Sequence, residues 1–394
     1  MIIKTNLSRF LILFVLLGLL LMPEQAAEAY SHAIFTNPQE QDYFPMPLCL
    51  PGMPNDGTCL FYGPAQTVEE MREDGIPYPI RELPAAHPPT ELGEMPVYIA
   101  KINYPDDQPA PIYGTFEDAV ARVNPISFIA PGTLRYVSYI DWQGHDGNAY
   151  LLLSTGGWMR ASPAAYTDFQ GLEFYENPSN NFGWIVNETP AYKEPSFNAD
   201  TSDVVLNREE IIQVYNQQEV DGYIWYQIAP DQWVDSTKAK IVSFNPIPPE
   251  GVDSDRWIEI NLFQQTMAVY EDGQLQYASL VTSGVAPLYT RPGLFQIFEK
   301  KPLETMQGAT AEDRSDFYYL QDVPWTMYFD EARALHAAYW RTHFGYPASH
   351  GCVNLSPTDA NWLFHWAEEG DYVWVHDPSG ETPTDPDLYG PGAP

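Results

Sequence analysis

The run Ser349-His350-Gly351-Cys352-Val353-Asn354 is the most specific stretch of this sequence. A glycine at position 351 lets the backbone turn tightly, so that consecutive N–H groups can point at one spot. Such donors stabilise the oxyanion of a tetrahedral intermediate. A thiolate at Cys352 could attack a carbonyl group held there. The run therefore predicts a cysteine nucleophile in an oxyanion-binding turn.

This thiol needs a base, because a free cysteine with a pKa of about 8.5 is mostly protonated at neutral pH. Two histidines are candidates. His350 lies only two residues from Cys352, so its side chain is expected to point elsewhere. His336 lies sixteen residues upstream, far enough for the chain to loop round and face the thiol. The sequence therefore favours His336 as the base.

The neighbouring residues resemble a known family. The runs Leu335–Trp340 and Phe344–Leu355 are similar to the L,D-transpeptidase catalytic domain, also called the YkuD-type domain. That domain carries a His, a spacer, and then Ser/Thr-His-Gly-Cys-x-Asn or Arg. Its supporting pieces follow here in the expected order, at Pro292–Phe295, Asp322–Trp325 and Met327–Phe329. The resemblance covers residues 255–377 and has a short spacer, with twelve residues between His336 and Ser349.

The resemblance implies a role for each matching position. Cys352 would be the nucleophile and His336 the base, and the backbone carbonyl of Ala337 would orient the His336 ring. The family often has Gly or Ser at that position, but only its carbonyl is used. The residues implied to shape the oxyanion turn are Ser349, His350, Gly351 and Asn354, and those implied to line the acyl-donor groove are Tyr328 and Trp340.

The implied reaction is acyl transfer on peptidoglycan stem peptides. Cys352 attacks the carbonyl of the third residue of a tetrapeptide stem, and the terminal D-Ala leaves. The thioester then passes to the side-chain amine of a neighbouring stem. A thiolate–imidazolium pair is sufficient for the proton transfers, so no cofactor or metal is expected.

Several alternatives stay open. The thioester could react with water, which would make the protein an L,D-carboxypeptidase, or the chain could be a non-catalytic wall-binding protein. Cys352 could be an inert buried thiol. A zinc site is a further alternative, but its histidines are spaced more widely than usual; the candidate ligands are His336, His343, His350 and Cys352. An NlpC/P60-type hydrolase places Cys before His, the reverse of the order here. His365 and His376 are expected to be surface or helix residues.

The N-terminus reads as an export signal. Lys4 and Arg9 precede the apolar run Phe10–Met22, and Ala27-Glu28-Ala29 fits a cleavage site that would leave Tyr30 as the first mature residue. The apolar run is shorter than the roughly 20 residues that a membrane span needs. A net charge of -34 argues against nucleic acid as a partner. We therefore expect a monomeric exported protein of the cell wall, periplasm or extracellular space, with no stable membrane span after signal cleavage.

Export favours a disulfide between Cys49 and Cys59, which lie close together in a Pro- and Gly-rich stretch. Cys352 is then the free thiol. The stretch from residue 30 to 94 reads as an irregular Pro-rich leader, and residues 378–394 read as a disordered tail.

The middle of the chain contains a weak internal repeat. Asp146-Gly147 and Asp221-Gly222 are followed at equal offsets by aromatic and apolar residues, ending in Trp158-Met159 and Trp233-Val234. Each block reads as turn, strand, short turn, strand, and resembles the bacterial SH3-like domains found beside wall enzymes. The alternative is one larger β domain with a chance echo.

The predicted fold is mainly β. A C-terminal β-sandwich of the L,D-transpeptidase type at 255–377 follows two small SH3-like β-barrels at 95–170 and 180–245, after a linker at Pro246–Gly251. The one well-defined helix is expected over Ser356–Glu369, with Ser356 as its cap and Pro357 in its first turn. The expected strands of this domain are Trp257–Leu262, Thr266–Tyr270, Gln276–Thr282, Gly293–Phe298, Trp325–Phe329 and Tyr372–Val375.

Overall fold

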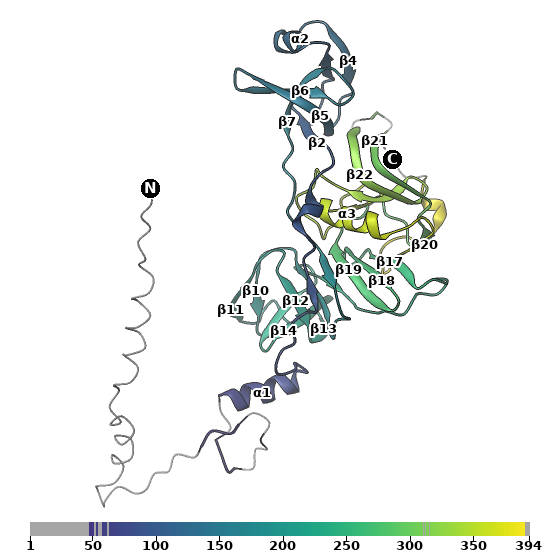
Figure 1. The fold of residues 1–394 in the computed structure, drawn as a ribbon. Helices are drawn as coiled ribbons and strands as arrows, with labels where there is room; N and C mark the ends of the chain where they lie inside the picture. The colour runs from purple at the N-terminus through teal and green to yellow at the C-terminus, as the bar shows by residue number, and fades with distance from the viewer. Residues whose placement is uncertain are drawn as a thin grey trace, which may run out of the picture. The chain divides into compact units, whose positions relative to one another are not determined.

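The computed structural model describes residues 47–50, 53, 57–60, 63–309, 311, 313, 314 and 316–390. The predicted signal peptide and the start of the leader lie outside the described residues. The chain divides into two compact units, residues 1–67 and 68–394. Secondary structure is mainly β (Figure 1), as the sequence predicts. No helix in the described part of the chain is long and apolar enough to cross a membrane.

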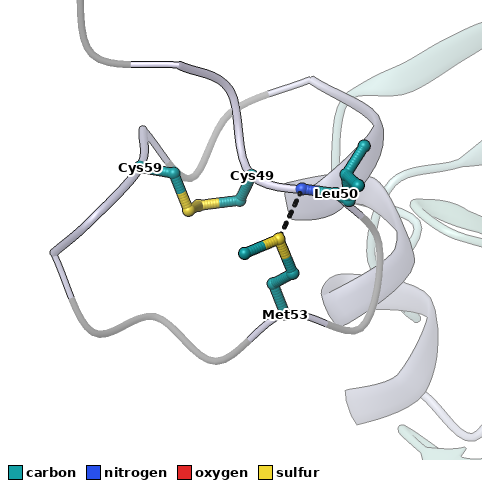
Figure 2. The surroundings of a disulfide bond; sticks show 4 residues. All are labelled: Cys49, Leu50, Met53 and Cys59. Atoms are coloured by element: carbon teal, nitrogen blue, oxygen red, sulfur yellow. Dashed lines mark hydrogen bonds between the residues drawn. A yellow bond between two sulfur atoms is a disulfide. The ribbon is translucent and has the colours of Figure 1, made fainter.

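The first unit is organised around a disulfide between Cys49 and Cys59, the pair that the sequence predicts. Figure 2 shows the loop that this bond closes, in which the Leu50 N–H also points at the Met53 sulfur at 3.4 Å. A hydrogen bond of 2.9 Å from Cys49 N to Leu60 O ties the two sides of the loop together. Helix α1 (Pro64–Glu73) begins in this unit and ends in the second.

The first predicted β module forms one compact group of strands with its own apolar core, which includes Val137, Leu151 and Met159. The Asp146-Gly147 turn joins two of its strands, with both residues at positive φ (47° and 73°), as a tight two-residue hairpin requires. The elements of this module are β2 (Tyr98–Ile102), β3 (Ala110–Tyr113), α2 (Phe116–Ala121), β4 (Pro125–Ile129), β5 (Leu134–His145), β6 (Asn148–Leu153) and β7 (Trp158–Pro163).

The second module has two small sheets, in the orders β11-β10-β15-β14-β13 and β12-β9-β16. Its Asp221-Gly222 turn repeats the positive φ values of the first module (53° and 80°), so the two blocks are equivalent hairpins. The likeness to SH3 domains stays a prediction. Its strands are β9 (Asn181–Ile185), β10 (Thr189–Tyr192), β11 (Thr201–Leu206), β12 (Ile211–Val214), β13 (Asn216–Val220), β14 (Tyr223–Ala229), β15 (Gln232–Asp235) and β16 (Ala239–Val242).

The C-terminal region packs two sheets and one helix around a shared core that contains Ile258, Val269, Leu335 and Leu363. Helix α3 (Pro357–Trp366) begins where the sequence predicts, because the Ser356 side chain accepts the Asp359 N–H as a cap; it ends three residues early. The strands are β17 (Arg256–Asn261), β18 (Thr266–Glu271), β19 (Gln274–Leu280), β20 (Gly293–Gln296), β21 (Glu299–Gly308), β22 (Tyr318–Asp330), β23 (Arg333–Ala337), β24 (Val353–Leu355) and β25 (Tyr372–His376).

The sheets cross the domain limits that the sequence predicts. Strand β5 of the first module pairs in parallel with β22, with Leu134 opposite Tyr318. Two short strands, β1 (Ala85–Ala86) and β8 (Leu172–Phe174), add to the edge of the sheet formed by β17–β20 and β25. The 3-10 helix η1 (Thr90–Gly93) packs on α3, where the Asn361 side chain donates to Leu92 O at 2.8 Å. The modules are therefore continuous with the C-terminal domain.

Residues 378–390 have a defined path, in contrast to the disorder predicted for 378–394. The Asp377 carboxylate accepts hydrogen bonds from Ser379 and Thr382, and a 3-10 helix, η2, covers Pro386–Leu388. Arg333 donates to Gly390 O at 2.9 Å and lies over the Tyr389 ring at 5.3 Å. Composition alone did not predict this order, because the partner that fixes the segment is on β23.

Candidate active site

Two neighbouring parallel strands bring the predicted base and nucleophile together. His336 lies on β23, directly opposite Asn354 on β24, and Cys352 immediately precedes β24. This pairing closes the fifteen residues between His336 and Cys352 into a loop. Both side chains are buried, with 2% of His336 and 8% of Cys352 exposed.

Hydrogen bonds fix the orientation of the His336 ring. Its Nδ1 lies 3.0 Å from Ala337 O, and its Nε2 lies 3.1 Å from the Asn354 side-chain nitrogen. Arg341 Nε, which can only donate, lies 2.6 Å from Asn354 Oδ1. The Asn354 amide must therefore direct its NH₂ group toward His336. Consequently His336 carries its proton on Nδ1 and keeps Nε2 as an acceptor, the form that a general base needs.

Burial makes both reactive groups neutral at rest. It lowers the pKa of His336 to about 4, a shift that the hydrogen bond to Ala337 opposes and the charge of Arg341 reinforces. It raises the pKa of the Cys352 thiol to about 11, although a hydrogen bond from the Ala334 backbone and the charge of Arg333 act in the opposite direction. The thiol points at Ala332 O at 3.8 Å. The resting state thus differs from a thiolate–imidazolium pair.

The turn before Cys352 has the conformation that its glycine permits. Gly351 has φ of +118°, and a Cβ there would meet Arg333 Nε at 3.3 Å. Ser349 Oγ donates to Cys352 O at 2.5 Å and accepts from Gly351 N at 3.2 Å, while Thr290 donates to Gly351 O at 2.8 Å. Across the described residues, the N–H groups of His350 and Cys352 make no hydrogen bond. Both are available to an oxyanion.

The thiol and the imidazole open onto one cavity of 70 Å³. Its walls are mostly apolar, and they come from the catalytic turn, from β21 and β22, and from β5 of the first module. The residues that line it are Leu134, Met306, Tyr318, Leu320, His336, Trp340, Arg341, Ala348, Ser349, His350, Cys352 and Asn354.

Residues 255–375 match the family model described as the L,D-transpeptidase catalytic domain, YkuD. The C-terminal part of this chain is therefore similar to the L,D-transpeptidase catalytic domain. The matched residues contain β17 to β24, helix α3, the turn before Cys352 and all of β25 except His376.

Solved structures of L,D-transpeptidases are also similar to this chain. One from Stackebrandtia nassauensis is 28% identical, with a TM-score of 0.27, and the match covers 34% of this chain and 59% of that protein. The catalytic domain from E. faecium is 29% identical, with a TM-score of 0.29, and is covered completely by 32% of this chain. An enzyme from Mycobacterium smegmatis is 17% identical, with a TM-score of 0.30 and coverage of 52% and 90%. No curated protein sequence gives a significant match.

Most of the site residues predicted for the L,D-transpeptidase domain meet at this cavity, but Tyr328 does not line it. Tyr328 is buried against Ala334 and Cys352, and its ring stacks on Phe298 at 6.2 Å. Tyr328 contacts Cys352 from the face of β22 opposite the main core, because Met327 and Phe329 on either side of it point into that core. Trp340 does line the cavity, with its ring 5.7 Å from that of His336.

The sequence did not single out six residues of the cavity wall, which are Leu134, Met306, Tyr318, Leu320, Arg341 and Ala348. Leu134, Met306, Tyr318 and Leu320 lie far from the motif along the chain, and only strand pairing brings them to it. Arg341 carried a usable signal, because it is a cation placed between the predicted base and nucleophile.

The other histidines have separate environments. His343 hydrogen-bonds Thr342 at 2.6 Å, His365 contacts Asn361 O, and His376 pairs with Glu259 at 2.8 Å. Within the described ranges, His, Cys, Asp and Glu side chains form no group of three that could hold a metal ion.

Proposed function

We propose that this protein is a peptidoglycan L,D-transpeptidase that forms cross-links through a thioester on Cys352. The observation that carries the proposal is the arrangement of His336 and Cys352 on one cavity, with Nε2 of His336 held as an acceptor. The matched family acts on peptidoglycan peptides, which supports a substrate outside the cytoplasm and is consistent with the predicted export signal.

Acylation begins from the neutral pair. As Cys352 Sγ attacks the carbonyl carbon of the third stem residue, its proton passes to His336 Nε2, which the Asn354 amide releases. The N–H groups of His350 and Cys352 receive the negative charge on the carbonyl oxygen. The C–N bond to the terminal D-Ala then breaks, and the leaving amine takes the proton from His336. The products are a thioester on Cys352 and free D-Ala.

The second step repeats these proton transfers in reverse. The amine of an acceptor stem attacks the thioester, forms an amide bond and releases the Cys352 thiol. Water could attack instead, which would make the protein an L,D-carboxypeptidase. The apolar wall formed by Leu134, Met306 and Trp340 disfavours loosely held water compared with a bound amine. The acidic chain, with a net charge of -34, also favours the approach of a cationic amine. Both features support transfer.

The deciding experiment is incubation with a disaccharide-tetrapeptide, followed by mass analysis of products and protein. We expect covalent dimers that have lost one D-Ala, and an adduct on Cys352. Tripeptide monomers alone would make the enzyme a carboxypeptidase. A protein that forms no adduct and no product would be a wall-binding protein.

Two variants complete this test. Cys352→Ala should abolish dimer formation and keep the fold, because the change removes one sulfur atom. His336→Ala should strongly reduce acylation. Ertapenem is a convenient acylating reagent, since the similar E. faecium catalytic domain has been described in a form acylated by it. Wild-type activity in Cys352→Ala would overturn the mechanism.

A further inference from the structure

Arg341 is a half-buried cation without a carboxylate partner among the described residues. Its Nε donates to Asn354 Oδ1 at 2.6 Å and its Nη2 to Ala348 O at 2.5 Å, and both acceptors are neutral. Burial lowers the pKa of Arg341 to about 10. An arginine that is partly withdrawn from water and lines a cavity is normally paired with an anion. In a chain with 53 acidic and 19 basic residues, the missing partner is informative.

The cavity around Cys352 also has an uneven distribution of charged residues. Among its lining residues there is no Asp or Glu, and Arg341 is the single Arg or Lys. Nη1 of Arg341 has no hydrogen-bond partner in the described structure. It is not one of the fully buried polar atoms that lack a partner, so it remains accessible. Arg341 also lines the adjoining hollow of 380 Å³ with Leu134, Trp340 and His343. Arg341 is therefore shared by this hollow and by the cavity that contains the thiol.

The position of Arg341 relative to the base suggests which anion it takes. One amide group, that of Asn354, separates its guanidinium from His336 Nε2. In the proposed acylation, the leaving nitrogen sits beside Nε2 to receive its proton. The carboxylate of the leaving residue is attached one carbon further on, so its oxygens lie within about 4 Å of that nitrogen by standard bond lengths. That carboxylate would therefore lie near the Arg341 guanidinium.

We propose that Arg341 binds the terminal carboxylate of the donor stem peptide and thereby selects donors that end at the leaving residue. This inference rests on the proposed function. The guanidinium holds the leaving residue next to His336. The carboxylate that it binds then leaves the site with the released D-Ala. A second source of the same chemistry is a side-chain carboxylate on the third stem residue, as in diaminopimelate, and the experiment separates the two.

The first arm uses the unmodified enzyme and needs no variant. Acylation of Cys352 is followed by mass with a tetrapeptide donor that ends in a free carboxylate, and with the same donor ending in a carboxamide. Because charge-assisted hydrogen bonds from arginine are strong, we expect kcat/KM to fall roughly 10- to 100-fold for the carboxamide. Each donor is made with lysine and with diaminopimelate as third residue. The ratio of kcat/KM between the carboxylate and the carboxamide donor should be the same in both series.

The second arm uses Arg341→Met and Arg341→Lys. Loss of the guanidinium also disturbs Asn354, which would slow both donors equally. Loss of carboxylate binding instead abolishes the preference, so the ratio of kcat/KM between donors should fall to about 1 in Arg341→Met. Arg341→Lys should keep part of it, because lysine retains the charge but not the paired donors. Arg81→Met, which removes an exposed arginine, should keep the full preference.

The outcomes distinguish failure of the Arg341 role from failure of the proposed function. Equal acylation by carboxylate and carboxamide donors would overturn the role of Arg341 and leave the proposed function standing. A preference that depends on diaminopimelate and is indifferent to the terminal carboxylate would also overturn it. A preference unchanged in Arg341→Met would assign the binding to another group. No adduct with any donor would overturn the proposed function, and this inference with it.

Discussion

The protonation state of the resting thiol gives a direct test of the site. Burial raises the pKa of Cys352 to about 11 and lowers that of His336 to about 4. The free enzyme should therefore hold a thiol and a neutral imidazole across the physiological range. At pH 7.5, a pKa of about 11 leaves roughly 300-fold less thiolate than the ordinary cysteine pKa of about 8.5 would.

The expected alkylation rate follows from this fraction. A more basic thiolate is also more nucleophilic, which restores roughly tenfold of the loss, so the rate at pH 7.5 should be about 20- to 30-fold below that of an exposed cysteine, before any hindrance by burial. The rate with iodoacetamide should then rise about tenfold per pH unit from pH 7 to 10. Cys49 and Cys59 are bonded to each other, so Cys352 alone should be labelled.

A matched variant makes the result decisive. In His336→Gln, the shape of the pH profile should be unchanged, because a neutral imidazole does not stabilise a thiolate at rest. A plateau that begins below pH 8 in the wild-type enzyme, and that disappears in His336→Gln, would refute the reasoning and restore a resting thiolate–imidazolium pair. Labelling of Cys49 or Cys59 in the unreduced protein would refute the disulfide.

Three further predictions follow from individual residues. Burial lowers the folded-state pKa of His336, so the stability that this neutral side chain contributes is present above pH 6.5 and is lost as the pH falls through about 4. In His336→Gln, the free energy of unfolding should lose about 3 kcal/mol less than in the wild-type protein over this range. An identical pH dependence of the two proteins would contradict this prediction. Gly351→Ala should lower stability by about 1–2 kcal/mol and abolish acylation, because its φ is +118° and Arg333 is close, whereas Gly273→Ala, at φ +72° in open space, should lose stability only; normal acylation by Gly351→Ala would show that the turn tolerates a side chain. Full-length Cys352→Ala protein should co-sediment with purified wall, and Trp142→Ala, which removes a tryptophan 61% exposed on β5, should reduce the bound fraction; unchanged binding would assign the first module a spacer role.

Local sequence was sufficient where short-range forces decide the conformation. The Asp-Gly pairs at 146 and 221 predict hairpin turns because both positions require positive φ, and the structure has them. Ser356 and Pro357 predict the start of α3 because a cap and a first-turn proline act within one turn. The motif from Ser349 to Asn354 likewise predicts a turn at Gly351, since only glycine accepts that backbone without strain.

Tertiary structure decided everything that depends on which strands become neighbours. The pairing of β5 with β22 brings Leu134 to the cavity, and no local pattern in the sequence records such a non-local register. The same holds for the contact of Tyr328 with Cys352 and for the ordered path of residues 378–390 against Arg333. Burial is also a property of the assembled fold. It alone sets the neutral state of Cys352 and His336 and leaves the Arg341 guanidinium facing the cavity, because desolvation depends on all the surrounding side chains at once.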